Sequence, residues 1–279
     1  MSLTVQQSLT RLTRILREAG LETPATDARL LLAHVLEVDA GWLILMLGES
    51  LDAERLDRAL ALAEKRRGRM PLSHLLGFRD FFNHRFHITP EVLDPRPETG
   101  ALVQAALERD FARVLDLGTG SGAIVISLLA ARPDAVGLAT DLSQAALDIA
   151  RDNARSLAVE GRCWFLLSDW FADVDGKFDL IVSNPPYIAA DEMAGLAPEL
   201  AHEPRLALTD EGDGLSAYRA IIAGAPAHLE PGGRLMVEIG PTQGAAVAEM
   251  FRAAGLENLA ILPDLDGRDR VVRGEMPRR

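Results

Sequence analysis

Four consecutive residues, Asn184-Pro185-Pro186-Tyr187, combine a side-chain amide, constrained backbone carbonyls and an aromatic face. This set suits a planar NH2 group that awaits alkylation. The preceding residues, 178–183, form an apolar run typical of a buried strand. Because ligands bind at the carboxyl ends of strands in open α/β sheets, we expect this acceptor motif (residues 184–187) to lie in a binding site. An isolated Asn-Pro pair is more simply explained as a turn, so the interpretation depends on the rest of the chain.

A glycine-rich turn upstream supplies that context. It lies between a predicted strand at 113–115 and an apolar helix at 123–129. Glycines let a ligand approach the backbone closely, and the start of a helix presents unpaired N–H groups. A strand, this glycine turn and a helix in succession predict a nucleotide-type pocket. The glycine turn consists of Gly118, Thr119, Gly120, Ser121 and Gly122.

The chemistry of the turn favours a cationic ligand over a dinucleotide. Its spacing is Gly-x-Gly-x-Gly, which lacks the third glycine position of the dinucleotide fold. Asp116, directly before the turn, would repel a phosphate and attract the ammonium and sulfonium of S-adenosylmethionine. A nicotinamide-dependent oxidoreductase and an inert binding protein are the contrasting hypotheses. The spacing and Asp116 count against the first, and the intact Asn184 and Asp141 count against the second.

Asp141 is the candidate for binding the ribose of such a ligand. It follows the predicted strand 135–140, at a distance from Gly120 that is typical of an acid accepting the ribose hydroxyls. Asp141 is also suited to cap a helix that begins near Ser143. The two roles are compatible.

Together these motifs resemble class I S-adenosylmethionine-dependent methyltransferases, and the fuller pattern resembles the peptide chain release factor glutamine N5-methyltransferases of the HemK or PrmC type. Arg96-Pro97-Glu98-Thr99 narrows the resemblance to the release factor type. Two positions depart from the family pattern, Asp94 and Gly100, and we assign no binding role to either. The resemblance covers nearly the whole chain, and further segments that carry it are 168–171, 203–208, 213–215, 231–233, 238–240 and 267–270.

The resemblance implies S-adenosylmethionine as methyl donor, S-adenosylhomocysteine as product and no metal. The implied acceptor is the glutamine of the Gly-Gly-Gln motif in release factors. A ribosomal protein glutamine or an adenine exocyclic amine is the alternative acceptor. Asp169 would accept from the adenine amine and Trp170 would pack on its ring, unless Trp170 is buried under the sheet. The implied cofactor residues are Gly118, Thr119, Gly120, Ser121, Gly122, Asp141, Asp169, Trp170 and Asn184.

The electronics of a carboxamide define the roles of the acceptor motif. Its nitrogen is a weak nucleophile, so the enzyme must orient it against the reactive methyl group. We expect the Asn184 side-chain oxygen and the Pro185 carbonyl each to accept one substrate N–H, which favours charge build-up on the nitrogen. Pro186 removes a competing N–H donor. Tyr187 would stack on the amide plane, or serve as a core aromatic. Asn184, Pro185 and Tyr187 are therefore the candidate catalytic residues. All four residues of the acceptor motif, Pro186 included, are expected to contact substrate.

Charge bears on the partner. The net charge is −12, and residues 1–75 carry equal numbers of basic and acidic side chains, so the excess lies in the remainder. Such acidity disfavours stable nucleic-acid binding, and a protein partner is expected instead. The basic cluster Lys65-Arg66-Arg67-Arg69 is interpreted as a solvated helix end.

Composition indicates a globular cytoplasmic protein. With 279 residues, 48% of them hydrophobic, the chain can bury one large core and a smaller companion. Its single cysteine, Cys163, suits a reducing compartment. No secretory pattern is visible, and the apolar run Trp42–Leu47 is too short to span a membrane. The six histidines lack the spacing of a zinc site.

Periodicity predicts three parts. Residues 1–75 form a helical substrate-recognition domain, with helices that include 40–47 and 52–67. Residues 76–95 form a β-hairpin linker. Residues 96–279 form a doubly wound, Rossmann-like domain with a mostly parallel seven-stranded sheet and one antiparallel strand. The last two strands, near 257–263 and 269–275, have no helix between them.

Overall fold

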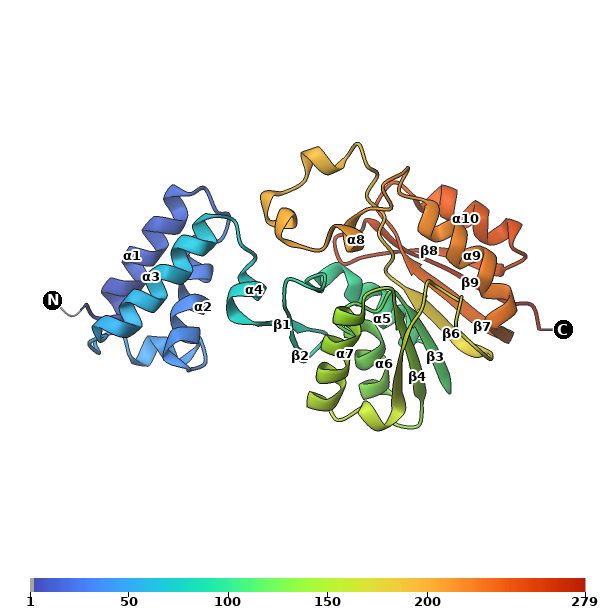
Figure 1. Ribbon diagram of the computed structural model, residues 1–279, viewed down its shortest axis with the longest axis horizontal. Helices are drawn as coiled ribbons and strands as arrows, with labels where there is room; N and C mark the ends of the chain where they lie inside the picture. Colours follow the sequence, from blue (N-terminus) through green and yellow to red (C-terminus); the bar gives the residue numbers. More distant parts are fainter. Residues whose placement is uncertain (1–2, 279) are drawn as a thin grey trace. The chain divides into compact units, whose positions relative to one another are not determined.

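The computed structural model describes residues 3–278, which divide into two compact units (Figure 1). The first unit contains the residues up to 77 together with the segment 197–202. The second contains residues 78–196 and the residues from 203 onward. The chain therefore leaves the second unit once, for a six-residue segment that follows the acceptor motif, and returns to it.

The first unit is a bundle of helices. Its first helix begins with a capping box, in which Thr4 and Gln7 satisfy each other's backbone N–H groups. Leu12, Leu16 and Leu31 of the facing helices are fully buried. The elements are α1 (Val5–Glu18), α2 (Pro24–Leu36), η1 (Trp42–Leu45), α3 (Ala53–Arg67), α4 (Leu72–Leu76) and η5 (Pro198–His202).

The helix predicted at 40–47 is wrong, because these residues form only the short 3-10 turn η1. Asp39 accepts a hydrogen bond from the Gly41 N–H at 2.7 Å, which favours a local turn over a helix start. Leu43 is buried, whereas Trp42, Ile44 and Leu45 are 61%, 72% and 70% exposed. An α-helix here would have had no buried apolar face to stabilise it.

The interpretation of the basic cluster is wrong for Arg66. Its side chain is only 11% exposed, and it forms ion pairs with Asp27 at 2.8 Å and Glu199 at 3.1 Å. Arg69 lies 3.3 Å from the same Glu199 carboxylate. Arg67, in contrast, is exposed and pairs along its own helix with Glu64. The cluster therefore holds the segment 197–202 within the first unit.

The second unit is built on a seven-stranded sheet with the order β5-β4-β3-β6-β7-β9-β8. Strands β3 to β7 pair in parallel, and β9 is antiparallel to both of its neighbours. This confirms the predicted doubly wound sheet with one antiparallel strand. The strands are β3 (Arg113–Leu117), β4 (Val136–Asp141), β5 (Cys163–Leu167), β6 (Phe178–Ser183), β7 (Leu229–Glu238), β8 (Glu257–Pro263) and β9 (Asp269–Glu275).

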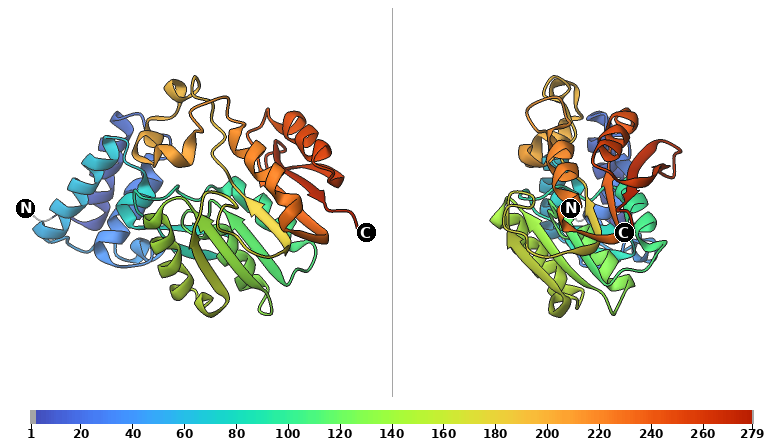
Figure 2. Two further views of the ribbon diagram at one scale, coloured as in Figure 1. Left: turned by 45° about the vertical axis from the view of Figure 1, so that its right-hand side comes forward. Right: turned by 90° about the vertical axis from the view of Figure 1, so that its right-hand side faces the viewer.

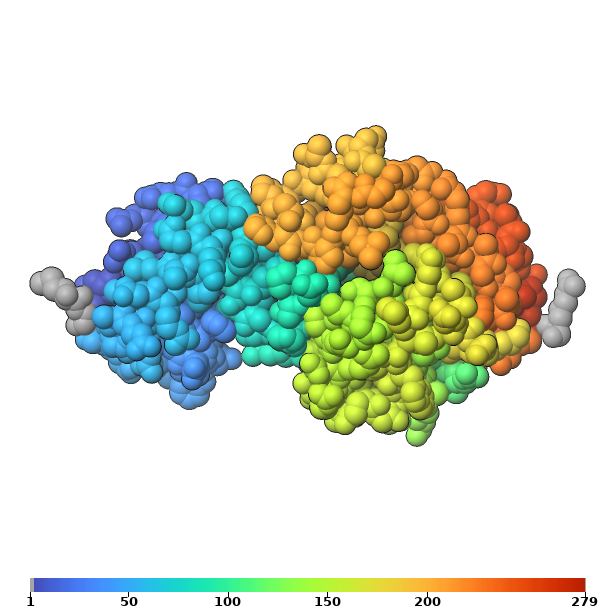
Figure 3. Space-filling view, in the orientation of Figure 1, coloured from blue at the N-terminus to red at the C-terminus, as the bar shows by residue number. Residues whose placement is uncertain are grey.

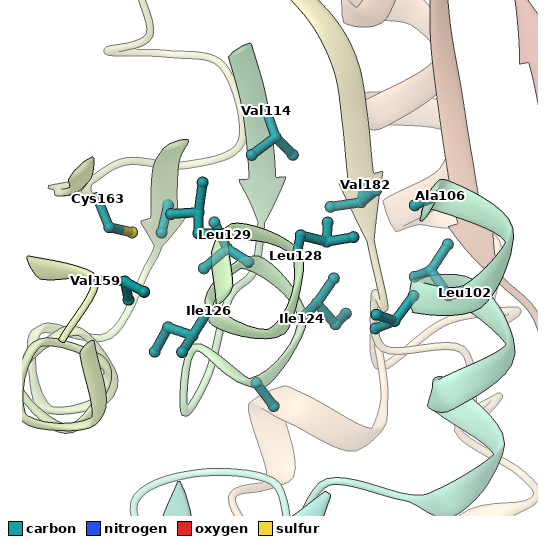
Figure 4. Packing of buried hydrophobic residues seen from close by; sticks show 14 of the residues in the cluster. Leu102, Ala106, Val114, Ile124, Ile126, Leu128, Leu129, Val159, Cys163 and Val182 are labelled. Atoms are coloured by element: carbon teal, nitrogen blue, oxygen red, sulfur yellow. The ribbon is translucent and has the colours of Figure 1, made fainter. Parts of the chain in front are cut away.

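Helices cover both faces of the sheet (Figure 2). Alternate residues of each central strand enter opposite cores, as Val114 and Leu115 of β3 do. The first core, shown in part in Figure 4, lies under α5, α6 and α7. The second lies under α9 and α10. The helices are α5 (Gly100–Leu107), α6 (Ala123–Ala131), α7 (Gln144–Ser156), α8 (Arg205–Leu208), α9 (Ser216–His228) and α10 (Gly244–Ala253), with 3-10 turns η2 (Pro97–Thr99), η3 (Glu160–Arg162) and η4 (Met193–Gly195).

The predicted hairpin is formed by β1 (Phe78–Phe81) and β2 (His84–His87). Phe81 and Phe86 enter the first core, so the hairpin packs as part of the second unit. Asn153 of α7 bonds both the N–H and the carbonyl of His87, at 2.7 and 3.1 Å, and donates to the Ser121 carbonyl at 2.9 Å. One buried amide therefore links the hairpin to the glycine turn. Within residues 3–278, no helix is long and apolar enough to cross a membrane.

Gly122 allows α6 to pack closely on α7, and this predicts a defect from a single methyl group. Its φ is +81°, and an added Cβ would lie 2.6 Å from Ile126 Cδ1 and 3.2 Å from Ala150 Cβ. Gly122→Ala should lower the free energy of unfolding by about 1–3 kcal/mol in urea denaturation. Gly161→Ala is the matched control, because its Cβ would meet no atom within 4 Å and it should change little. Equal stability of the two variants would contradict this packing role.

Candidate active site

A cavity of about 540 Å³ lies at the carboxyl ends of the parallel strands. Its wall includes residues that follow β3, β4, β5 and β6, and the segment 204–220 forms another side. In the space-filling view, the orange surface around 205–220 lies beside the yellow-green surface around 140–150, over these two walls (Figure 3). The volume is in the range of small-molecule sites. The predicted site residues on its wall are Gly118, Gly120, Asp141, Asp169, Trp170, Asn184 and Pro186.

The glycine turn meets the cavity through two glycines and is held from behind by its other residues. Gly118 and Gly120 have φ values of +70° and +55°, and a Cβ on Gly120 would meet no atom within 4 Å. Thr119 is buried, with its N–H bonded to the Thr140 carbonyl at 2.9 Å. Thr119, Ser121 and Gly122 are not among the lining residues. The turn therefore presents backbone to the cavity and keeps its side chains in the core.

Asp116 lies in the protein interior and not in the cavity. Its Oδ2 accepts from Thr119 Oγ1 at 2.7 Å and from the Val125 N–H at 3.3 Å. Burial raises the pKa of Asp116 from 3.8 to about 7, against the lowering effect of these two hydrogen bonds. Asp116 thus shapes the turn and the start of α6. The Asp116 side chain is completely buried and does not line the cavity, and its predicted attraction of a cationic ligand stays a prediction.

Asp141, the last residue of β4, links this strand to the glycine turn that follows β3. Its Oδ2 accepts from the Gly120 N–H at 2.8 Å, and its Oδ1 accepts from the Ser143 N–H at 2.9 Å. Ser143, not Asp141, is the N-cap of α7, since its hydroxyl accepts from the Ala146 N–H. Burial raises the pKa of Asp141, and the backbone hydrogen bonds oppose that effect. Each carboxylate oxygen has two lone pairs, so both retain capacity for a ligand hydroxyl.

Trp170 and Asp169 form the wall beyond β5. Trp170 has a φ of +49°, and its ring lies against Gly118, where an added Cβ would be 3.6 Å from the ring. It is half-buried and also packs against the second core, so cavity lining and core packing are both present. Asp169 is exposed.

The acceptor motif divides between the cavity and the interior. Asn184 and Pro186 line the cavity, whereas Pro185 is buried and Tyr187 is not a lining residue. Tyr187 packs beside the second core, near Gly240. Burial raises the pKa of its hydroxyl. The stacking role of Tyr187 therefore stays a prediction, and its core contacts are present in this structure.

Sequence reasoning missed a glutamine that holds the acceptor motif. Gln243 donates to the Tyr187 carbonyl at 2.9 Å and the Gly214 carbonyl at 3.2 Å. Its oxygen accepts from the Gly240 N–H at 3.0 Å and the Tyr218 hydroxyl at 3.3 Å. A polar residue in the short loop after β7 was the available signal, because that loop lies at the same edge of the sheet.

The Arg-Pro-Glu-Thr segment is tied through Arg96 to Glu203, which follows the acceptor motif in the chain, and to Asp94. Arg96 forms an ion pair with Glu203 and lies 3.7 Å from Asp94, which also pairs with Arg79. Asp94, one of the two departures from the family pattern, is thus a buried partner of two arginines.

The comparisons with known proteins give the class first. The model of the methyltransferase small domain matches residues 96–215, and that of the PrmC N-terminal domain matches residues 7–77. The fold is similar to a methyltransferase from Pyrococcus furiosus (TM-score 0.53, 17% identity, 69% of this chain and 88% of that chain). It is also similar to a T. thermophilus 16S rRNA N2 G1207 methyltransferase (TM-score 0.52, 20% identity, 71% and 49%). The solved structures show a Rossmann-like fold, and the family model gives the class, a protein with a methyltransferase domain.

Full-length relatives give the family. A release factor glutamine methyltransferase from Cereibacter sphaeroides is 55% identical over 263 residues, covering 94% of this chain and 95% of that one. A relative of the same name from Burkholderia pseudomallei is 46% identical over 273 residues, with the same coverage. The chain belongs to the release factor glutamine methyltransferase family, which confirms the resemblance found in the sequence.

The raised pKa of Asp116 predicts a pH-dependent stability. The native state retains a proton on Asp116 between its ordinary pKa of 3.8 and about 7, where the unfolded chain has lost it. The stabilisation of the native state by protonated Asp116 is therefore fully present below pH 3.8 and is lost as the pH rises through about 7. Relative to Asp116→Asn, wild-type stability should fall by on the order of 3–4 kcal/mol between pH 4 and 8, measured by urea unfolding.

Asp110→Asn is the control for this titration, because the Asp110 side chain is 97% exposed. Its pH dependence should follow the wild type. Parallel stability curves for wild type and Asp116→Asn would show that the buried carboxyl does not titrate in this range.

Proposed function

We propose that this protein methylates the side-chain amide nitrogen of the glutamine in the Gly-Gly-Gln motif of peptide chain release factors, with S-adenosylmethionine as donor. One observation carries the proposal: Asn184 of the acceptor motif and Asp141 of the ribose prediction lie on the wall of one cavity. Membership of the release factor glutamine methyltransferase family supports the acceptor. The alternative acceptors, a ribosomal protein glutamine and an adenine amine, are not favoured by these relatives.

The residues around the cavity fit the donor. Asp141 has spare acceptor capacity for two ribose hydroxyls, and Gly118 and Gly120 leave the backbone of the turn open to the methionine portion. Trp170 supplies an apolar surface for the adenine, and Asp169 is placed beside it. When bound, S-adenosylmethionine supplies a methyl group activated by its sulfonium.

The acceptor motif would orient the glutamine amide. Asn184 Oδ1 and the Pro185 carbonyl each accept one N–H of the substrate, which directs the nitrogen lone pair toward the donor. The nitrogen would form one new bond to the methyl carbon as the carbon–sulfur bond breaks, with S-adenosylhomocysteine as the leaving group. The proton that methylation makes acidic would then pass to solvent. Asn184 therefore acts through orientation and charge stabilisation, and no side chain is required to remove the proton beforehand.

The buried carboxylate of Asp116 and the side-chain amide of Gln243 would keep the glycine turn and the acceptor motif in place. Asp116 holds the glycine turn, and Gln243 holds the carbonyl of Tyr187. Residues 3–278 contain no group of three or more His, Cys, Asp or Glu side chains suited to a metal ion. A metal-free reaction, cytoplasmic localisation and the lack of a stable nucleic-acid partner stay predictions.

We propose that the helical unit docks the release factor. Its 3-10 turn η1 exposes three apolar side chains, Trp42, Ile44 and Leu45, which we call the η1 patch. Exposed aromatic and aliphatic groups of this kind are typical of protein contacts. The match of residues 7–77 to the PrmC N-terminal domain supports a family-specific role for this unit.

Asn184→Ala should abolish methyl transfer and keep most of the donor affinity. Loss of an oriented acceptor should lower kcat by about 100-fold or more.

Asp141→Ala should give the opposite pattern, with the Kd for S-adenosylmethionine raised roughly 10–100-fold by the loss of two hydrogen bonds to a charged group. The measurement uses labelled donor with purified release factors, ribosomal proteins and DNA side by side, and calorimetry for donor affinity.

Normal turnover by Asn184→Ala would refute the acceptor model. An unchanged donor Kd in Asp141→Ala would refute the ribose assignment. Labelling of a ribosomal protein or DNA in place of release factors would replace the proposed substrate.

Replacing the η1 patch by alanines (Trp42→Ala, Ile44→Ala and Leu45→Ala together) should raise the KM for a whole release factor by roughly tenfold. Methylation of a short Gly-Gly-Gln peptide should be unaffected, because the peptide reaches only the cavity. Trp164→Ala is the matched control, since this tryptophan is 57% exposed on the edge strand β5 of the other unit. An unchanged KM for the whole factor would remove the patch from docking.

A further inference from the structure

The side-chain amide of Asn184 has to present its oxygen, not its NH2 group, to a substrate N–H. The two ends of an amide have nearly the same shape, so its orientation is set by hydrogen bonds. Asn184 lies 3.4 Å from Thr99 Oγ1, with its Nδ2 as the donor. The orientation of the acceptor amide therefore depends on what the Thr99 hydroxyl does with its own proton.

The Thr99 side chain bonds Asn184 and not the first turn of its own helix. It occupies the N-cap position of α5, where a threonine commonly bonds the first turn. Here its side chain makes no capping hydrogen bond. The residue is 4% exposed, and its hydroxyl lies near enough to the carboxylate of Glu238 to lower the pKa of that group.

Glu238 ends β7, beside the strand that leads to the acceptor motif. Ser183 of β6 pairs in register with Val237, so Asn184 and Glu238 are the next residues of two neighbouring parallel strands. Glu238 is 1% exposed. Among residues 3–278, its Oε2 is buried without a hydrogen-bond partner. This buried carboxylate oxygen is therefore available to accept a hydrogen bond from the neighbouring Thr99 hydroxyl.

We propose that Glu238 and Thr99 are positioning residues for the reaction: the Glu238 carboxylate takes the single proton of the Thr99 hydroxyl, so Thr99 accepts from Asn184 Nδ2 and Asn184 Oδ1 faces the methyl acceptor. A hydroxyl has one proton to donate. When Thr99 donates it to Glu238, Thr99 can only accept from Asn184, which excludes the orientation in which the Asn184 oxygen faces Thr99. The inference rests on the proposed function, because it explains how that function's acceptor residue is oriented.

Protonation of Glu238 would reverse the direction of these hydrogen bonds. A carboxylic acid can donate to Thr99, and Thr99 would then donate to the oxygen of Asn184 and turn the NH2 group toward the substrate. Burial raises the pKa of Glu238 to about 7, opposed first by the neighbouring Thr99 hydroxyl. The charged groups that also act on it are Arg270 of β9 and Arg96, which lower the pKa, and Glu98 of η2, which raises it. The hydroxyls of Tyr187 and Tyr218 lie within its electrostatic influence.

The test is the pH profile of kcat at saturating donor and substrate between pH 6 and 8.5. Wild type should lose activity as the pH falls through about 7, the pKa of Glu238. Thr99→Val keeps the shape of the side chain and removes the hydroxyl, so kcat should fall roughly tenfold and the acid limb should vanish. Glu238→Gln should also lose the acid limb. Thr99→Ser, which restores the hydroxyl, should recover most of kcat together with the limb.

Thr140→Val is the control, because Thr140 is fully buried and its hydroxyl has no hydrogen-bond partner within the described residues. It should retain both kcat and the acid limb, and unfolding midpoints check that each variant is folded. The proposal is overturned by a Thr99→Val enzyme that keeps the acid limb, by full activity in that variant, or by a flat wild-type profile. If wild type does not methylate release factors at all, the proposed function fails instead, whereas an inactive Asn184→Ala beside a fully active Thr99→Val refutes only this inference.

Discussion

The parallel pairing of β4, β3, β6 and β7 is the constraint on which the site depends. It brings the carboxyl ends of four strands to one edge of the sheet, and β3 and β6 are the neighbours at which the winding of the chain reverses. Such a point leaves a crevice that helices do not fill. The glycine turn follows β3, Asp141 ends β4, and Asn184 follows β6. Backbone register alone therefore assembles groups that are distant in the chain.

This edge concentrates carboxyl groups in a poorly solvated place. Asp116, Asp141 and Glu238 all have raised pKa values, and burial is the largest cause in each. Asp116 and Asp141 are partly compensated by N–H or O–H donors from the segments that follow the strands, such as Thr119 to Asp116 and Gly120 to Asp141. The turns are therefore ordered by the same groups whose ionisation is costly. Such clusters of perturbed groups are typical of functional sites.

The second requirement is that irregular segments stay in place around the cavity. Gln243 holds the Tyr187 carbonyl at the end of the acceptor motif, and the ion pair of Arg96 with Glu203 holds the chain farther along. The segment 197–202 between them belongs to the helical unit, where Glu199 pairs with Arg66 and Arg69. The chain that carries the acceptor motif is thus continuous with part of the unit to which we attribute docking.

The sequence by itself determined the local features: the glycine turn, the acceptor motif, the hairpin, and the final strands at 257–263 and 269–275, which the structure matches. These depend on residue types and periodicity within a short stretch of chain. It could not decide that Thr119, Ser121 and Gly122 would support the turn from behind, or that Arg66 would be buried. Only the tertiary structure decided that Thr99, Asn184 and Glu238 meet, because their contact arises from strand register and burial between segments that no local pattern connects.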